Sequence, residues 1–69
     1  MKRAQVIRTV QKAAKMAGLS FEIVELKNHT GLVVDGHRAT LGRHREIDEV
    51  TVKSYFKQFE AVLGKGWWK

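Results

Sequence analysis

Apolar side chains recur every three or four positions near the start of the chain, at Val6, Ile7, Val10, Ala13, Ala14 and Ala17. This is the period of an α-helix that buries one face, so the pattern predicts a helix near residues 4–17. Gly18 follows the last of these residues and suits the left-handed conformation that commonly ends a helix.

From Leu19 onward apolar residues fall at every second position, which is the period of a strand and predicts one near residues 19–26. Asp35-Gly36 is a dipeptide favoured in tight two-residue hairpin turns, because both positions adopt a positive φ. It separates two further predicted strands, near residues 29–34 and 37–41. Short connections between three successive strands indicate an antiparallel sheet.

A second helix is predicted near residues 48–63, again from helical spacing. Its apolar stripe consists of Val52, Tyr55, Phe56, Phe59 and Leu63. Asp48 is the expected N-cap, with Thr51 in the same first turn. Neither helix can bury its stripe alone, so both should pack on one face of the sheet. The predicted fold class is α+β, a three-stranded antiparallel sheet in the order α-β-β-β-α.

The chain has 69 residues, enough for one domain over residues 1–69 with a small core. It has no cysteine, which excludes a disulfide framework and a thiolate metal site. No apolar run approaches the ~20 residues of a membrane-spanning helix. Arg8, Gln11 and Lys12 interrupt any signal-peptide core. These features predict a cytoplasmic protein that does not bind membranes.

Charge is the outlying feature of the composition. Thirteen Lys and Arg residues and seven Asp and Glu residues give a net charge of +6. The first twenty residues contain no acid but carry the bases Lys2, Arg3, Arg8, Lys12 and Lys15. Such a segregated excess is typical of polyanion binders and favours contacts with phosphates, whereas the alternative is a plain solvated basic surface.

The predicted hairpin brings a titratable side chain towards further bases. His29 lies at the start of the strand over residues 29–34, and Arg43-His44-Arg45 follows the strand over residues 37–41. In an antiparallel hairpin these two ends lie side by side. An imidazole exchanges protons near neutral pH, and neighbouring cations stabilise charge that develops on a phosphate.

The other candidate side chains have simpler interpretations. His37 directly follows the turn and is expected to be a solvated strand residue. His44 lies between two arginines and should bond to backbone or phosphate, although it is also the best candidate for a second acid or base. At least one of Trp67 and Trp68 should cover the core, which leaves the other for a partner or a base.

Several short motifs, in the same order, resemble those of the HicA family of bacterial toxins, small ribonucleases with an α-β-β-β-α fold like the double-stranded-RNA-binding domain. The matching stretches are Val6 to Val10, Ala17-Gly18, Asn28-His29-Thr30, Asp35-Gly36, Arg43 to Ile47 and Thr51-Val52. The chain departs from the family pattern at Lys27-Asn28, where a glycine is usual, and at Gly42, which replaces a proline.

The resemblance implies a metal-independent endoribonuclease (an mRNA interferase), the toxin of a type II toxin–antitoxin system, with His29 as general acid or base and no cofactor. It also implies RNA as substrate and an acidic, HicB-like antitoxin that covers His29. The expected RNA contacts are Lys2, Arg3, Arg8, Lys12, Lys15, Lys27, Arg43, His44 and Arg45. The alternative is a non-catalytic RNA- or DNA-binding module with the same basic surface, because a fold does not fix a function.

Overall fold

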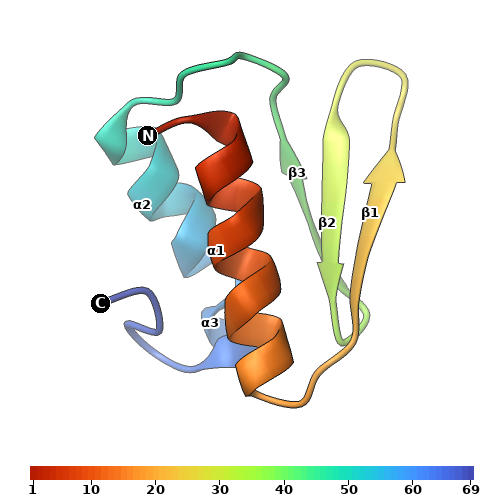
Figure 1. The fold of residues 1–69 in the computed structure, drawn as a ribbon, viewed down its shortest axis with the longest axis vertical. Coiled ribbons are helices and arrows are strands. Elements are labelled where there is room, and N and C mark those ends of the chain that lie inside the picture. Colours follow the sequence, from red (N-terminus) through yellow and green to blue (C-terminus); the bar gives the residue numbers. More distant parts are fainter.

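The computed structural model describes residues 1–69 and contains two layers, one of helices and one of strands (Figure 1). The elements are α1 (Arg3–Met16), β1 (Phe21–Glu25), β2 (Thr30–Val34), β3 (His37–Leu41), α2 (Glu49–Lys57) and α3 (Glu60–Leu63). All strands pair antiparallel in the order β1-β2-β3, so the predicted α+β class and sheet topology are confirmed. None of the helices is both long and apolar enough to cross a bilayer.

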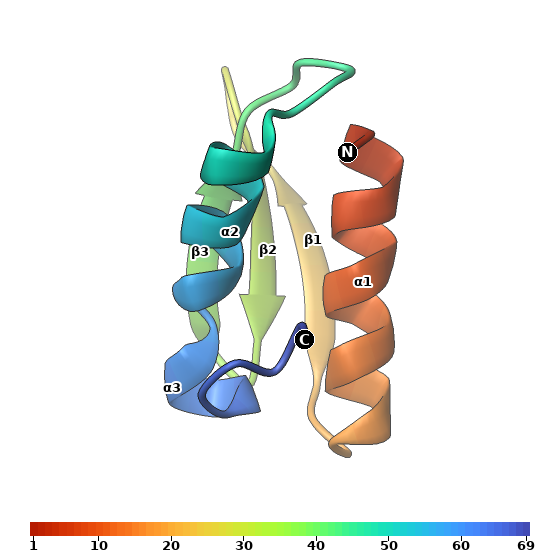
Figure 2. The same ribbon diagram turned by 90° about the vertical axis from the view of Figure 1, so that its left-hand side faces the viewer.

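Both long helices cover the same face of the sheet, as a comparison of the two views shows (Figures 1 and 2). The register places Leu32 of β2 opposite Ile23 of β1 and Ala39 of β3. Residues opposite one another point to the same face, and here that face lies under the helices. Leu32 and Ala39 are buried, whereas Ile23 on the edge strand is 50% exposed.

The predicted apolar stripes supply most of the core. The buried apolar residues are Val6, Val10, Ala14, Leu32, Val34, Ala39, Leu41, Ile47, Val52, Tyr55, Phe56 and Phe59. Tyr55 is the member with a polar group, and its hydroxyl donates to Ala39 O at 2.8 Å. Burial raises the pKa of the Tyr55 phenol above its ordinary value, so the hydroxyl stays protonated and keeps donating.

Local sequence signals set the helix ends and the hairpin turn as predicted. Gly18 has a φ of 70° just after α1, and Asp35 and Gly36 have φ values of 49° and 81°. Asp48 accepts hydrogen bonds from Thr51 N–H at 3.0 Å and Thr51 Oγ1 at 2.6 Å. These hydrogen bonds, led by the hydroxyl, hold the pKa of Asp48 below its usual range.

The first strand is shorter than the predicted range of residues 19–26. Leu19 N–H donates to Ala14 O at 2.9 Å and so completes the end of α1 instead of joining the sheet. Leu26 N–H donates to His29 O at 2.8 Å and closes the turn between β1 and β2. His29 therefore lies in this turn, one residue before β2, and not at the start of a strand.

The prediction of one continuous helix over residues 48–63 is wrong, because the chain tightens between α2 and α3. Phe59 N–H donates to Phe56 O at 3.1 Å, three residues back instead of four. Trp67 Nε1 donates to the same carbonyl at 2.8 Å. The carbonyl that a continuous helix would present to Glu60 N–H is thus used by the tail.

The tail after α3 folds back onto α2. The Phe56 ring centroid lies 5.0 Å from that of Trp67 and 6.1 Å from that of Trp68. Both indoles are half-buried in this packing. The expectation that at least one of the two covers the core is confirmed, and it holds for both.

Replacing Tyr55 by Phe should lower the free energy of unfolding by about 0.5–1.5 kcal/mol, because the buried hydrogen bond from the hydroxyl to the Ala39 carbonyl is lost. Chemical denaturation of the two proteins measures the difference. Lys53→Gln, an exposed change on the same helix, is the control and should stay within about 0.5 kcal/mol of wild type. A Tyr55→Phe protein as stable as wild type would show that this hydrogen bond makes no net contribution.

Candidate nucleic-acid interface

The chain start, the β1–β2 turn and the segment after β3 all lie at one end of the molecule (Figure 1). The first residues pair antiparallel with the segment after β3. Arg3 N–H donates to Arg45 O at 2.9 Å, and Ile47 N–H donates to Met1 O at 2.9 Å. Met1 returns a hydrogen bond from its amino group to Ile47 O at 2.8 Å. This pairing, which lies outside the predicted elements, holds the start of α1 against the basic segment.

The pairing gathers four of the predicted phosphate-binding side chains around one hollow, which we call the basic groove. It has a volume of about 450 Å³ and is lined by Lys2, Arg3, Ala4, Arg43 and Arg45. No acid lines it, and Ala4 belongs to the first turn of α1, where free N–H groups add partial positive charge. The basic groove is therefore suited to a phosphate.

Arg43 was predicted to bind phosphate, but its guanidinium already forms several hydrogen bonds within the protein. Its Nη1 donates to Lys27 O at 3.3 Å. Its Nη2 donates to His29 O at 3.1 Å and also to Leu26 O. The same Nη2 lies 3.1 Å from the Glu25 carboxylate. One guanidinium thus binds three carbonyls of the β1–β2 turn, and Arg43 positions that turn as well as lining the basic groove.

Thr30, next to His29 in the chain, joins α1 to the same network. It is fully buried, and its hydroxyl accepts a hydrogen bond from Arg3 Nη2 and donates to Glu25 Oε1 at 2.8 Å. The Thr30 hydrogen bond, assisted by Arg43, holds the pKa of the Glu25 carboxyl below its usual value. The backbone of His29 is consequently held by the hydrogen bonds of its own carbonyl and by those of the Thr30 side chain, the next residue in the chain.

The side chain of His29 is exposed, and no hydrogen bond within the protein engages its imidazole. Only the backbone of this residue is tied down, through its carbonyl to Arg43 and to Leu26 N–H. The contact with Arg43 confirms that the hairpin brings the backbone of His29 next to the basic segment. That the imidazole acts together with these bases stays a prediction.

The other predicted RNA contacts are spread along α1 and the turn. Arg8 and Lys12 are exposed and line a hollow of about 230 Å³ on the surface of α1. Lys15 is exposed near the far end of the helix, about 18 Å along the axis from Arg3 at the usual rise per residue. Lys27 is exposed in the β1–β2 turn. These residues can contact other phosphates of a long ligand, but Lys15 cannot share one with Arg3.

None of the three histidines lines the basic groove, and only His29 forms a hydrogen bond with one of its residues, through its backbone carbonyl. His44 lines a separate hollow at the start of α2, together with Asp48 and Thr51 among others. His37 is half-buried and not solvated as predicted, because its ring packs edge-on against Phe59 with centroids 5.9 Å apart. No three His, Asp or Glu side chains lie together in an arrangement that could hold a metal ion.

Glu25 and Thr30 are site residues that the sequence patterns did not indicate. They form the last pair of the β1–β2 ladder, directly opposite one another. A cross-strand pair of this kind brings its side chains within hydrogen-bonding distance. The register of the hairpin would have identified the pair, but the sequence alone placed the ends of both strands only approximately.

Replacing Arg43 by Lys should loosen the β1–β2 turn, because an ammonium group cannot reach the acceptors that the planar guanidinium binds together. Amide hydrogen exchange measures this at Leu26 N–H, which closes the turn. Exchange there should be faster in Arg43→Lys and unchanged in Arg45→Lys, the matched control. Equal protection of Leu26 in wild type and Arg43→Lys would show that the turn holds its shape without Arg43.

Replacing Glu25 by Gln should lower the melting temperature at pH 7 and have less effect in acid. The pKa of Glu25 is depressed in the folded protein below its ordinary value of 4.5, so folding favours the carboxylate. The stabilisation is complete above the unfolded pKa and is lost as the pH falls through the folded pKa. Thermal melts between pH 7 and about pH 3 test this, with Glu22→Gln on the same strand as control. If the melting temperature of wild type exceeded that of Glu25→Gln by the same amount at both ends of this pH range, the stabilising role of the Glu25 carboxylate would be contradicted.

Comparison with known proteins gives no family for this chain. No protein-family model, no curated protein and no solved structure matches it. The likeness to HicA toxins therefore stays a prediction from the short motifs, and the function has to be inferred from the groups at the site. Those groups are an exposed imidazole, the network that fixes its backbone, and the four cations of the basic groove.

Proposed function

We propose that the protein is a metal-independent endoribonuclease that cuts mRNA, with His29 as general acid or base. The observation that supports this best is the contact of Arg43, a residue that lines the basic groove, with the backbone carbonyl of His29, whose imidazole is exposed. RNA is the polyanion that combines a chain of phosphates with an internal nucleophile. The proposal places the protein in the cytoplasm, as the toxin of a toxin–antitoxin pair.

Cleavage of RNA without a metal ion needs an acid, a base and cations that stabilise negative charge. The 2′-hydroxyl of RNA attacks the adjacent phosphorus, loses its proton to a base, and expels the 5′-oxygen, which takes a proton from an acid. The products are a 2′,3′-cyclic phosphate and a 5′-hydroxyl. An imidazole can carry out either proton transfer near neutral pH. Lys2, Arg3 and Arg45 would stabilise the negative charge that grows on the phosphoryl oxygens.

Two donors without a partner at the groove also favour an anionic ligand. Arg3 Nε is buried and has no hydrogen-bond partner in the protein. A buried N–H without a partner is costly, and a phosphate oxygen bound beside Arg3 would supply one. Ala4 N–H, in the first turn of α1, likewise has no acceptor. Both donors come from the part of the chain that the pairing with Arg45 holds in place.

The proposed antitoxin is an acidic protein that covers the same surface. A partner with negative charge would be attracted by the net charge of +6, and it would compete with RNA for the basic groove. Because the imidazole of His29 is exposed, covering this one end of the molecule would be enough to silence it.

A non-catalytic RNA-binding module is the second candidate function, and one observation favours it. Catalytic imidazoles are usually oriented by a hydrogen bond to a third group. The His29 ring has no such partner within the protein, so any orientation has to come from the substrate. The same basic groove would serve a binder equally well.

Replacing His29 by Ala should reduce RNA cleavage by roughly 10²–10⁴-fold, the usual contribution of a general acid or base. Thermal stability and RNA affinity should stay at wild-type levels, since the ring is exposed and forms no hydrogen bond within the protein. The assay is cleavage of a long mRNA by purified protein in EDTA. His44→Ala removes an exposed imidazole from the separate hollow at the start of α2, so it is the control and should cut normally. If His29→Ala cuts as fast as wild type, His29 is not catalytic; if wild type binds RNA without cutting it, the protein is a binding module.

A further inference from the structure

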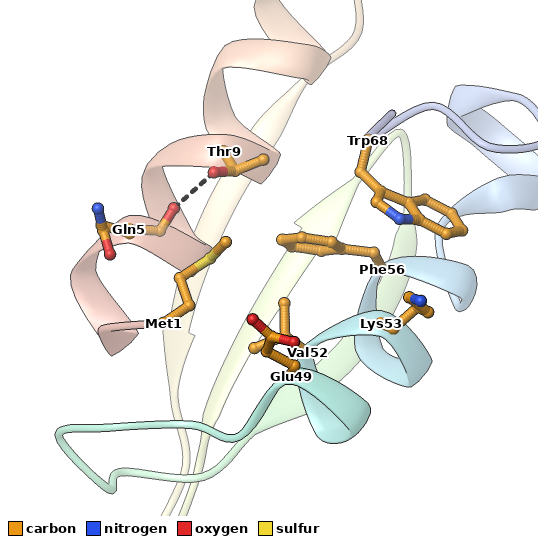
Figure 3. Close-up of a pocket in the computed structure, with 8 residues that line it drawn as sticks. All are labelled: Met1, Gln5, Thr9, Glu49, Val52, Lys53, Phe56 and Trp68. Atoms are coloured by element: carbon orange, nitrogen blue, oxygen red, sulfur yellow. Dashed lines mark hydrogen bonds between the residues drawn. The ribbon is translucent and has the colours of Figure 1, made fainter.

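A second groove, of about 520 Å³, lies between the two long helices (Figure 3). Val52 and Phe56 project into it from α2, Met1 lies on the side of α1, and Trp68 of the tail closes one end. Half of the lining residues are hydrophobic, namely Met1, Val52, Phe56 and Trp68. Val52 and Phe56 are almost fully buried, so the half-buried Trp68 is the aromatic wall with the most accessible surface. We call this hollow the α1–α2 groove. It is distinct from the basic groove and plays no part in the proposed cleavage.

We propose that the α1–α2 groove takes an unpaired base of the RNA whose backbone lies in the basic groove. This inference rests on the proposed function and adds a specificity subsite to it. The two grooves lie on either side of the first turn of α1. Lys2, Arg3 and Ala4 line the basic groove, whereas Met1 and Gln5 line the α1–α2 groove. A strand that crosses this turn can place a phosphate in one groove and a base in the other.

The surroundings of the α1–α2 groove complement a nucleotide. The hollow that contains Arg8 and Lys12 shares the lining residues Met1, Gln5 and Thr9 with it and contains no acid. At the other end, Lys69 Nζ lies 5.8 Å from the ring centroid of Trp68. A ligand in the groove is therefore flanked by cations. Aromatic walls for a base and cations for its phosphates together are the usual features of single-strand binding sites.

Two polar residues on α2 give the ligand an orientation. Glu49 and Lys53 line the groove, and neither forms an ion pair or a side-chain hydrogen bond. The edge of a base carries both donors and acceptors, which a carboxylate and an ammonium group can satisfy. The charge of Glu49 repels phosphates, so the base edge would face α2 while the backbone runs along α1, past Arg8 and Lys12.

The apolar walls would also accept side chains of a protein partner, but the charges favour RNA. A protein partner would need its own acidic groups placed to meet Arg8 and Lys12. An RNA strand already bound in the basic groove carries such charges on every nucleotide. The proposed ligand of the α1–α2 groove is therefore an unpaired base of the bound RNA.

The test compares two single strands of equal length that cannot be cleaved, one of 2′-O-methyl nucleotides and one with the same backbone but no bases. Fluorescence anisotropy gives the affinity of each strand. Wild type should bind the base-bearing strand about 5- to 150-fold more tightly, the range for stacking of one base on an aromatic side chain. Trp68→Ala, which removes an aromatic wall, and Thr9→Tyr, which fills the groove, should both abolish this preference without weakening binding of the abasic strand.

The controls make comparable changes to side chains outside the α1–α2 groove. Met16→Ala removes a hydrophobic side chain that is 80% exposed outside the groove, and Ser54→Tyr adds bulk to α2 outside it. Both should keep the preference for bases. If the groove variants also keep it, or if wild type binds both strands equally, the inference is wrong while the proposed function stands. If wild type binds neither strand, the proposed function fails as well.

Discussion

The Arg43 guanidinium binds the backbone carbonyls of the β1–β2 turn, and the position of His29 depends on that contact. Arg43 lies two residues after the end of β3. Its contact with the β1–β2 turn therefore joins the end of β3 to the segment before β2, at the top of the sheet in Figure 1. The turn carries no apolar side chain in the core, so its shape has to come from hydrogen bonds. An arginine suits this role because its planar fork reaches several acceptors at once.

A second constraint is the pairing of the chain start with the segment after β3. Without the hydrogen bonds between Arg3 and Arg45 and between Met1 and Ile47, the first turn of α1 would have no fixed place beside the basic segment. Because of this pairing, Arg3 and Arg43, which are forty residues apart in the chain, line the same groove. The first turn of α1 also separates the basic groove from the α1–α2 groove, so this one turn positions both candidate subsites.

Hydrophobic periodicity predicted the element order and most of the core, because burial of one face dictates the spacing of apolar residues. Asp35-Gly36 and Asp48 act locally, so their roles could also be read directly from the sequence. The break before α3 could not, because it depends on Trp67, which reaches back to a carbonyl of α2. The role of Arg43 was predicted only in part. Spacing showed that it returns towards His29, but not that carbonyls of the turn would occupy its guanidinium.

If the protein cleaves RNA, His29 and the basic groove must act on the same phosphate. The most direct test is an NMR titration of the protein with a short RNA whose 2′-hydroxyls are methylated, so that it binds without being cut. The imidazole signals of His29 and the guanidinium signals of Arg43 and Arg45 should shift together and saturate at the same RNA concentration. Guanidinium shifts at Arg43 and Arg45 with an unchanged His29 imidazole would contradict the proposed site.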